Sequence, residues 1–232
     1  MARSTTRLLL RDELIGFAKS KVMLVLWVIL PLIAILGYLF LPEELVQSRG
    51  LSRETIPATV FLGLIMSSIA GTVAALMVAV DIISERNRKV YELFVIRPIR
   101  REAIIWAKFL AVFTCVVVAC LVSLGAGLAI DAIRGTHLSS EVAYDIVKSL
   151  VSLVGVIALS CAVGVMFGVL ARSILVGVIL VLYVGQNVAI VPMLPVYFGW
   201  LPNHFWVFML VSGVLAVALV WGAGVVFRRA QL

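Results

Sequence analysis

Long apolar segments alternate with short polar segments along the whole chain. Crossing about 30 Å of hydrocarbon takes about 20 apolar residues at 1.5 Å per residue. By that criterion the sequence predicts six membrane-spanning helices, at residues 22–41, 57–83, 102–130, 146–170, 173–191 and 204–227. The chain, residues 1–232, is then a single transmembrane domain of the all-α class.

The composition supports this assignment. Hydrophobic residues make up 63% of the 232 residues, charged residues make up 13%, and the mean hydropathy is +1.19. A water-soluble domain of this size has too little interior for so many apolar side chains, so we expect an integral membrane protein in a lipid bilayer. The net charge of +7 does not indicate a nucleic-acid partner, because the basic residues occur in short clusters between apolar segments.

The distribution of Lys and Arg predicts the orientation of the chain. Fourteen of the 19 lie before the first span, between the second and third, between the fourth and fifth, or after the sixth. Loops rich in Lys and Arg stay on the cytoplasmic side of a membrane. We therefore expect a multi-pass protein of the cytoplasmic (inner) membrane with both termini in the cytoplasm.

Residues 3–20 are predicted to form an amphipathic helix. Apolar side chains recur there at helical spacing, namely Leu8, Leu9, Leu14, Ile15 and Phe17. Such a helix lies at the membrane interface, and here Arg3, Arg7 and Arg11 would lie near lipid phosphates. The alternative is a simple orientation signal without a structural role.

The segment from Asp81 to Lys108 is the most specific feature of the sequence. Val90, Leu93 and Phe94 recur at helical spacing, and Pro98 ends the run. We expect a short amphipathic helix on the cytoplasmic side, at 84–97, that presents an apolar ridge to a partner.

This segment resembles the signature stretch of the membrane subunits of type-2 ATP-binding-cassette (ABC) exporters. In that family the second span runs into an acidic-basic pair, a Leu-Glu-Leu-like core, a Pro followed by small or basic residues, and a Lys. The corresponding residues here are Glu85-Arg86, Tyr91-Glu92-Leu93, Pro98-Ile99-Arg100-Arg101 and Lys108. Lys89 stands where many members have Gly, which is a departure at the start of the predicted helix.

The resemblance implies a dimer of membrane subunits, formed with a second copy or a related permease, each resting on a separate ATPase subunit. It implies that 84–97 is the coupling helix, with contact residues Glu85, Arg88, Tyr91, Glu92, Phe94, Arg97 and Pro98. The turn near Arg172 would be a second, smaller contact. Spans two and five would line the translocation path, where the polar residues are Ser67, Ser68, Thr72, Tyr183, Gln186 and Asn187. The same polar groups often only hold helices together.

The chain has no motif for ATP binding. A phosphate-cradling loop requires G-x-x-x-x-G-K-[ST], and no Gly in this sequence is followed by Lys. We therefore expect no catalytic residue and no cofactor in this chain, with ATP and Mg bound by the partner subunit. We also expect no metal site, because the three cysteines lie in apolar runs and the two histidines lie in or beside predicted external loops.

Asp81 and Lys108 lie near the cytoplasmic ends of adjacent predicted spans, at similar expected depth. We hypothesise that this pair, or Glu85 with Lys108, locks the coupling helix to its spans. Loss of one charge should then impair coupling more than exchange of the two charges. The alternative is that each side chain extends to the interface unpaired.

These features predict a permease subunit of an ABC transporter, which forms the path for export of a hydrophobic or amphiphilic substrate. ATP hydrolysis in a separate subunit would drive transport. An ATP-independent secondary carrier or channel is one alternative, disfavoured because no charged residue is predicted near a span midplane and no internal repeat is evident. A haem maturation permease, which shares this architecture, is the other.

Overall fold

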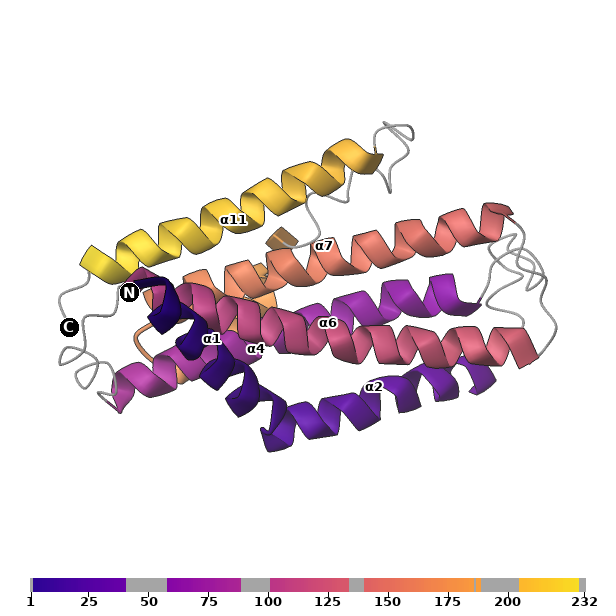
Figure 1. Cartoon of the computed structure of the whole chain (residues 1–232), viewed down its shortest axis with the longest axis horizontal. Helices are drawn as coiled ribbons and strands as arrows, with labels where there is room; N and C mark the ends of the chain where they lie inside the picture. The colour runs from indigo at the N-terminus through magenta and orange to yellow at the C-terminus, as the bar shows by residue number, and fades with distance from the viewer. Residues whose placement is uncertain are drawn as a thin grey trace.

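The computed structural model describes residues 2–40, 58–88, 101–133, 140–185, 187–188 and 205–229. Within these ranges the chain is helical and contains no strand, as the hydrophobic pattern predicted. The long helices form an elongated bundle (Figure 1). In chain order the elements are α1 (Ala2–Ala18), α2 (Lys21–Phe40), α4 (Ala58–Asn87), α6 (Arg101–Ile133), α7 (Ser140–Leu170), α8 (Ile174–Leu180), the π-helical turn η2 (Val181–Gly185) and α11 (Phe205–Arg229).

Three of the described helices are long and apolar enough to cross a membrane. These segments are Glu102–Ala129 in α6, Ile146–Leu170 in α7 and Phe205–Arg228 in α11. The bent pair Leu8–Ala18 and Lys21–Ile33 adds a fourth if it counts as one span. The structure thus supports a multi-pass membrane protein, and the six-span count stays a prediction.

One predicted boundary differs from the helix that forms. Residues 84–87, predicted to begin the coupling helix, are instead the last turn of α4, because no helix-breaking residue separates them from the span. The remainder of that predicted helix, from residue 89, lies outside the described residues. Of the fifth predicted span, the structure describes an apolar helix over Ile174–Gly185, formed by α8 and η2. Residues 186 and 189–191 of that span lie outside the described residues, so its full length stays a prediction.

A bend of 61° separates α1 from α2. Ser20 lies at the bend, where its hydroxyl accepts a hydrogen bond from the backbone N–H of Met23 at 3.1 Å. A serine in this position satisfies one of the N–H groups that the first turn of a helix leaves unpaired. The local sequence therefore ends one helix and starts the next, and α1 turns back against the bundle.

The central helix of the bundle is α6, which contacts α1, α2, α4, α7 and α11. Val112 and Val116 of α6 and Leu153 and Ile157 of α7 are fully buried members of the core. The outer faces of α2 and α11 instead expose large apolar side chains, among them Leu210 at 70% exposure. An apolar surface of this kind suits contact with lipid rather than water.

The closest helix packing joins α4 to α7. A Cβ atom added to Gly164 would lie 2.4 Å from the carbonyl oxygen of Ala75, and one added to Gly168 would lie 3.1 Å from the Cα atom of Ala79. Only glycine fits such a contact between two backbones, and small residues with this spacing let membrane helices approach closely. These two contacts, one helical turn apart, hold α4 closely against α7.

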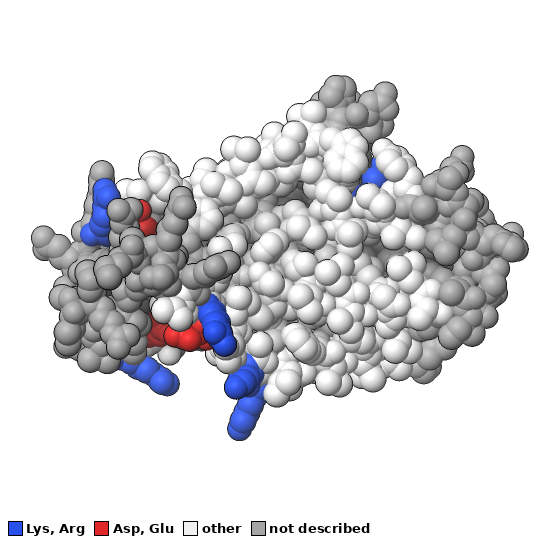
Figure 2. All heavy atoms as spheres, viewed as in Figure 1, with Lys and Arg blue, Asp and Glu red and all other residues white. Residues whose placement is uncertain are grey.

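Charged side chains gather at one end of the bundle. This end, which we call the charged end, contains the end of α4, the start of α6 and the end of α11 (Figure 1). In Figure 2 acidic and basic atoms cluster there, and the middle of the visible face has neither. The distribution matches a membrane protein whose apolar middle lies in hydrocarbon.

The packing of α4 on α7 predicts the effect of enlarging Gly164. Gly164→Ala should lower the stability of the folded chain by about 1–3 kcal/mol, because the new methyl group meets the Ala75 backbone. Gly213→Ala on α11 is the matched control: nothing lies within 4 Å of a Cβ there, and alanine favours a helix by about 0.5–1 kcal/mol. Thermal unfolding in detergent measures both variants. Equal midpoints would refute the close packing.

Candidate functional site

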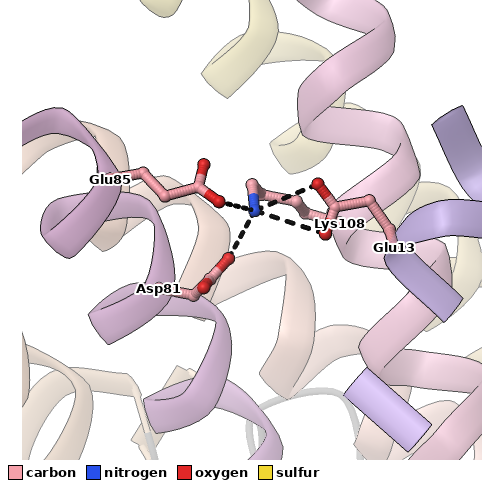
Figure 3. Close-up of polar contacts among 4 residues, drawn as sticks. All are labelled: Glu13, Asp81, Glu85 and Lys108. Carbon is pink, nitrogen blue, oxygen red and sulfur yellow. Dashed lines mark hydrogen bonds and ion pairs between the residues drawn. The ribbon is translucent and has the colours of Figure 1, made fainter. Parts of the chain in front are cut away.

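Lys108 of α6 lies at the centre of a cluster of three carboxylates. Its Nζ atom is 2.5 Å from Oδ2 of Asp81, 2.7 Å from Oε1 of Glu85 and 3.2 Å from Oε1 of Glu13. Asp81 and Glu85 come from α4, and Glu13 approaches from the opposite side on α1 (Figure 3). One ammonium group therefore joins three helices, and we call these four residues the Lys108 cluster.

The chain brings these residues together by simple spacing. At 1.5 Å per residue, Lys108 lies about 10 Å along α6 from its start, and Asp81 lies about 9 Å from the end of α4. The two side chains therefore reach the same depth when the helices run antiparallel. Glu85 lies one turn further along the same face of α4. The bend at Ser20 then lays α1 across α6, which places Glu13 on the third side.

Burial makes this cluster costly to disrupt. The Lys108 side chain is 1% exposed, and the side chains of Glu13, Glu85 and Asp81 are 20%, 26% and 31% exposed. A buried charge without partners is strongly unfavourable, since water no longer solvates it. The three carboxylates compensate for the lost hydration of the Lys108 ammonium. Because they are partly exposed, water can still hydrate their excess negative charge. Within the described residues no group suited to hold a metal ion is found.

Arg86, the neighbour of Glu85, makes a second contact at the charged end. Its Nη1 atom donates to the carbonyl oxygen of Val169 at 3.0 Å, and its Nη2 atom donates to that of Ala171. Both carbonyls lie where α7 ends, and the last carbonyls of a helix lack partners within the helix. A cation at this position is also favoured by the helix dipole. Arg86 thus fastens α4 to the end of α7.

A third contact joins α11 to α6. Nη1 of Arg228 lies 3.2 Å from Oε1 of Glu102, and both side chains are exposed to a substantial degree. An exposed ion pair of this kind contributes about 0–1 kcal/mol. It shows that the C-terminal helix ends at the same level as the start of α6, but it holds the two helices weakly.

The predicted coupling residues divide between described and undescribed parts of the chain. Arg88 is exposed at the end of α4, and Arg172 is exposed between α7 and α8. Glu85 is part of the Lys108 cluster and does not simply face outward. Tyr91, Glu92, Phe94, Arg97 and Pro98 lie outside the described residues. Their contact with an ATPase stays a prediction.

The structure places the predicted path residues without testing their role. Thr72 is half-buried on α4, and Ser67 and Ser68 lie on the same helix where side chains are not described. Tyr183 is 74% exposed on η2, and its carbonyl oxygen accepts a hydrogen bond from Nδ2 of Asn187 at 2.5 Å. Gln186 lies outside the described residues. An exposed tyrosine among apolar neighbours agrees with either a path or a lipid-facing position.

The N-terminal helix lies against the bundle along one face. Leu9, Leu14 and Phe17 pack on the core, and Arg11 is exposed on the outer side. Arg3 and Arg7 belong to α1, but their side chains are not described. The amphipathic pattern is therefore used at least partly for packing against α6, and the position of α1 at a membrane interface stays a prediction.

Glu13 and Arg86 were not predicted from the sequence as members of these contacts. A signal for Glu13 exists, because it lies four residues after Leu9 and four before Phe17, within the apolar face of the helix. A carboxylate inside an apolar stripe indicates a buried cationic partner. For Arg86 no comparable signal exists, because its partners are backbone carbonyls, which any sequence supplies.

Both contacts hypothesised for Lys108, with Asp81 and with Glu85, are present in the structure. The third partner changes the outcome expected for a charge exchange. An aspartate at position 108 would face Glu85 and Glu13, so exchanging the charges of Asp81 and Lys108 cannot restore the cluster. The expectation of a rescue by charge exchange assumed an isolated pair, and the tertiary structure removes that assumption.

One family of known proteins matches most of the chain. The family model of the ABC-2 family transporter proteins matches residues 8–198. That range begins in α1, before Glu13, and it contains Asp81, Glu85 and Lys108. A search of curated proteins gives no match.

The charge balance of the Lys108 cluster predicts unequal effects of its substitutions. Lys108→Met should destabilise the chain by about 3–5 kcal/mol, because it leaves three partly buried carboxylates without a cation. Asp81→Asn should cost much less, since Glu85 and Glu13 still neutralise the ammonium.

Lys148→Met is the matched control for the loss of a lysine. Lys148 lies over the ring of Tyr144, with Nζ 4.3 Å from the ring centroid, and such a contact contributes about 0.5–1 kcal/mol at an exposed site. Unfolding midpoints and the yield of monodisperse protein in detergent rank the three variants. If the Lys108 cluster does not stabilise the fold, Lys108→Met and Lys148→Met will have the same unfolding midpoint.

Proposed function

The chain belongs to the ABC-2 family of transporter proteins, and from this membership we propose that it is the permease subunit of an ABC exporter. Two such subunits, two copies or one copy with a related permease, form the translocation path. A separate subunit binds ATP with Mg and hydrolyses it. The charged end of the bundle faces the cytoplasm, where that ATPase subunit docks.

The observation that supports this proposal best is the Lys108 cluster at the base of the 89–100 segment. The segment leaves α4 shortly after Glu85 and enters α6 at Arg101, before Lys108. Its two ends are therefore tied together by Lys108 within about two turns of each helix. A force applied to the segment by a partner would therefore move α4 and α6 jointly.

The family resemblance assigns that force to ATP-driven closure of the ATPase subunit on the coupling helix. A push on the coupling helix would tilt α4 and α6 as one body, with α1 carried along through Glu13. Because α4 is packed on α7 through glycine, the tilt would also reach α7. The path between the two subunits would then open alternately to the two sides of the membrane.

The proposed substrate is hydrophobic or amphiphilic, such as a lipid, a drug or a peptide. The reason is the chemistry of the exposed surface on α8 and η2, where Leu175, Ile179 and Tyr183 are all exposed. An apolar surface with isolated hydroxyl and amide groups suits a solute that is itself mostly apolar. Ions or sugars would require more polar groups along the path.

Co-purification tests the proposed function. The tagged chain, extracted from its native membrane, should bring a Walker A ATPase subunit with it, and the complex should hydrolyse ATP. Glu92→Ala and Phe94→Ala should each lower that activity about tenfold, because the coupling contact is lost. Glu44→Ala and Phe198→Ala are matched controls in the predicted external loops and should leave the activity unchanged. If the chain purifies alone and exchanges solute in liposomes without ATP, the protein is a carrier and the proposal is wrong.

A further inference from the structure

The turn between α7 and α8 is held from two sides. On the α7 side, the carbonyl oxygens of Val169 and Ala171 accept hydrogen bonds from the guanidinium of Arg86. On the α8 side, the hydroxyl of Ser173 caps the helix by accepting from the backbone N–H of Val176 at 3.3 Å. The turn is therefore short, defined at both ends, and bonded to a different helix.

Helix α8 also rests directly on α4. A Cβ atom added to Gly177 would lie 2.4 Å from Cδ1 of Ile83, so the first turn of α8 packs directly against the Ile83 side chain of α4. Ile83 is fully buried and lies three residues before Arg86 on α4. Contacts from a single stretch of α4 thus fix both helices that flank the turn. Arg172, between them, remains exposed.

The same turn of α4 also contacts α6, through Glu85. Consecutive side chains of a helix point about 100° apart, so Glu85 and Arg86 can contact different helices. Glu85 contacts Lys108 on α6, and Arg86 contacts the end of α7. The last turn of α4 is consequently the one place in the described structure that is bonded both to the start of α6 and to the α7–α8 turn.

We propose that Arg86 is a positioning residue that ties the Arg172 turn to α4, the helix that leads into the predicted coupling segment, so that the two predicted cytoplasmic contacts move together. The inference rests on the proposed function, in which both contacts meet the ATPase subunit. Arg86 touches neither the substrate nor the ATPase in this arrangement. It holds the Arg172 turn to the helix from which the coupling segment departs, so that a displacement of one contact displaces the other.

The chemistry of the contact requires arginine rather than any cation. A guanidinium is a planar fork whose N–H groups can reach two carbonyl oxygens at once, whereas a lysine ammonium is a compact charge on a flexible stem. Arg86→Lys keeps the charge and loses the fork. Arg228→Lys is the matched control, because Arg228 makes one exposed ion pair at the same end of the bundle, which a lysine can also form.

Hydrogen exchange of the purified chain, without any partner, tests whether Arg86 holds the α7–α8 turn to α4. In Arg86→Lys the backbone amides of Val176 and Gly177, which bond to Ser173, should exchange about tenfold faster, because the turn opens locally. Amides in the middle of α11 should keep their rates. In Arg228→Lys the amides of Val176 and Gly177 should exchange as in the unaltered chain. Unchanged exchange of these two amides in Arg86→Lys would overturn the proposal.

A double-mutant cycle tests the functional part with the ATPase subunit that co-purifies. Arg172→Ala should lower the affinity of the chain for that subunit by about five- to tenfold, a typical loss when an interface side chain that contributes to binding is cut back to alanine. In the Arg86→Lys background the same change should have little further effect, since the turn is already displaced. Equal effects of Arg172→Ala in both backgrounds would show that the two sites act independently.

A second cycle leaves Arg86 intact and serves if Arg86→Lys does not fold. Phe94→Ala and Arg172→Ala should lower the affinity non-additively when the two contacts are tied, and additively when they are not. Failure of the inference and failure of the proposed function give different results. If an ATPase subunit binds and both substitutions act additively, only the inference fails. If no ATPase subunit binds, the proposed function is wrong and the inference falls with it.

Discussion

A lysine ammonium held about 10 Å along a helix that enters hydrocarbon is tolerated only when negative charge surrounds it. In this protein that requirement determines the arrangement of three helices. Asp81 and Glu85 must lie on the face of α4 that meets α6, and Glu13 must arrive on α1 from the other side. The bend at Ser20 and the antiparallel pairing of α4 with α6 both serve this one neutralisation.

The contacts of the charged end are of two physical kinds. The Lys108 cluster depends on side chains at both ends of each contact and is sensitive to any change of charge. The Arg86 contact depends on one side chain and on backbone carbonyls, so substitutions in the α7–α8 turn should leave its acceptors in place. Replacement of the guanidinium by another cation should not preserve it. Together they join α4 to its neighbours on two sides. The exposed pair of Arg228 and Glu102 adds little to this framework.

Packing distributes rigidity unevenly through the bundle. The glycine contacts of Gly164 and Gly168 bring the backbones of α4 and α7 together, where little sliding is tolerated. Helices α2 and α11 instead present broad apolar faces outward, and these faces are available to lipid or to another membrane subunit. The close packing of α4 on α7 suits the proposed tilting of these two helices as a unit.

The sequence alone determined the membrane class, the helical fold and the family, because these depend on segment length, composition and a local motif that survive without tertiary contacts. It also placed Asp81 and Lys108 at similar depth, with Glu85 as the alternative partner, since their spacing from the intervening segment is visible along the chain. Only the tertiary structure decided that Glu13 completes the cluster, because that depends on the direction in which α1 turns after its last residue. The contact of Arg86 with Val169 and Ala171 was likewise decided only by the tertiary structure. Its acceptors are backbone carbonyls, which every residue has, so no residue type in the sequence indicates them.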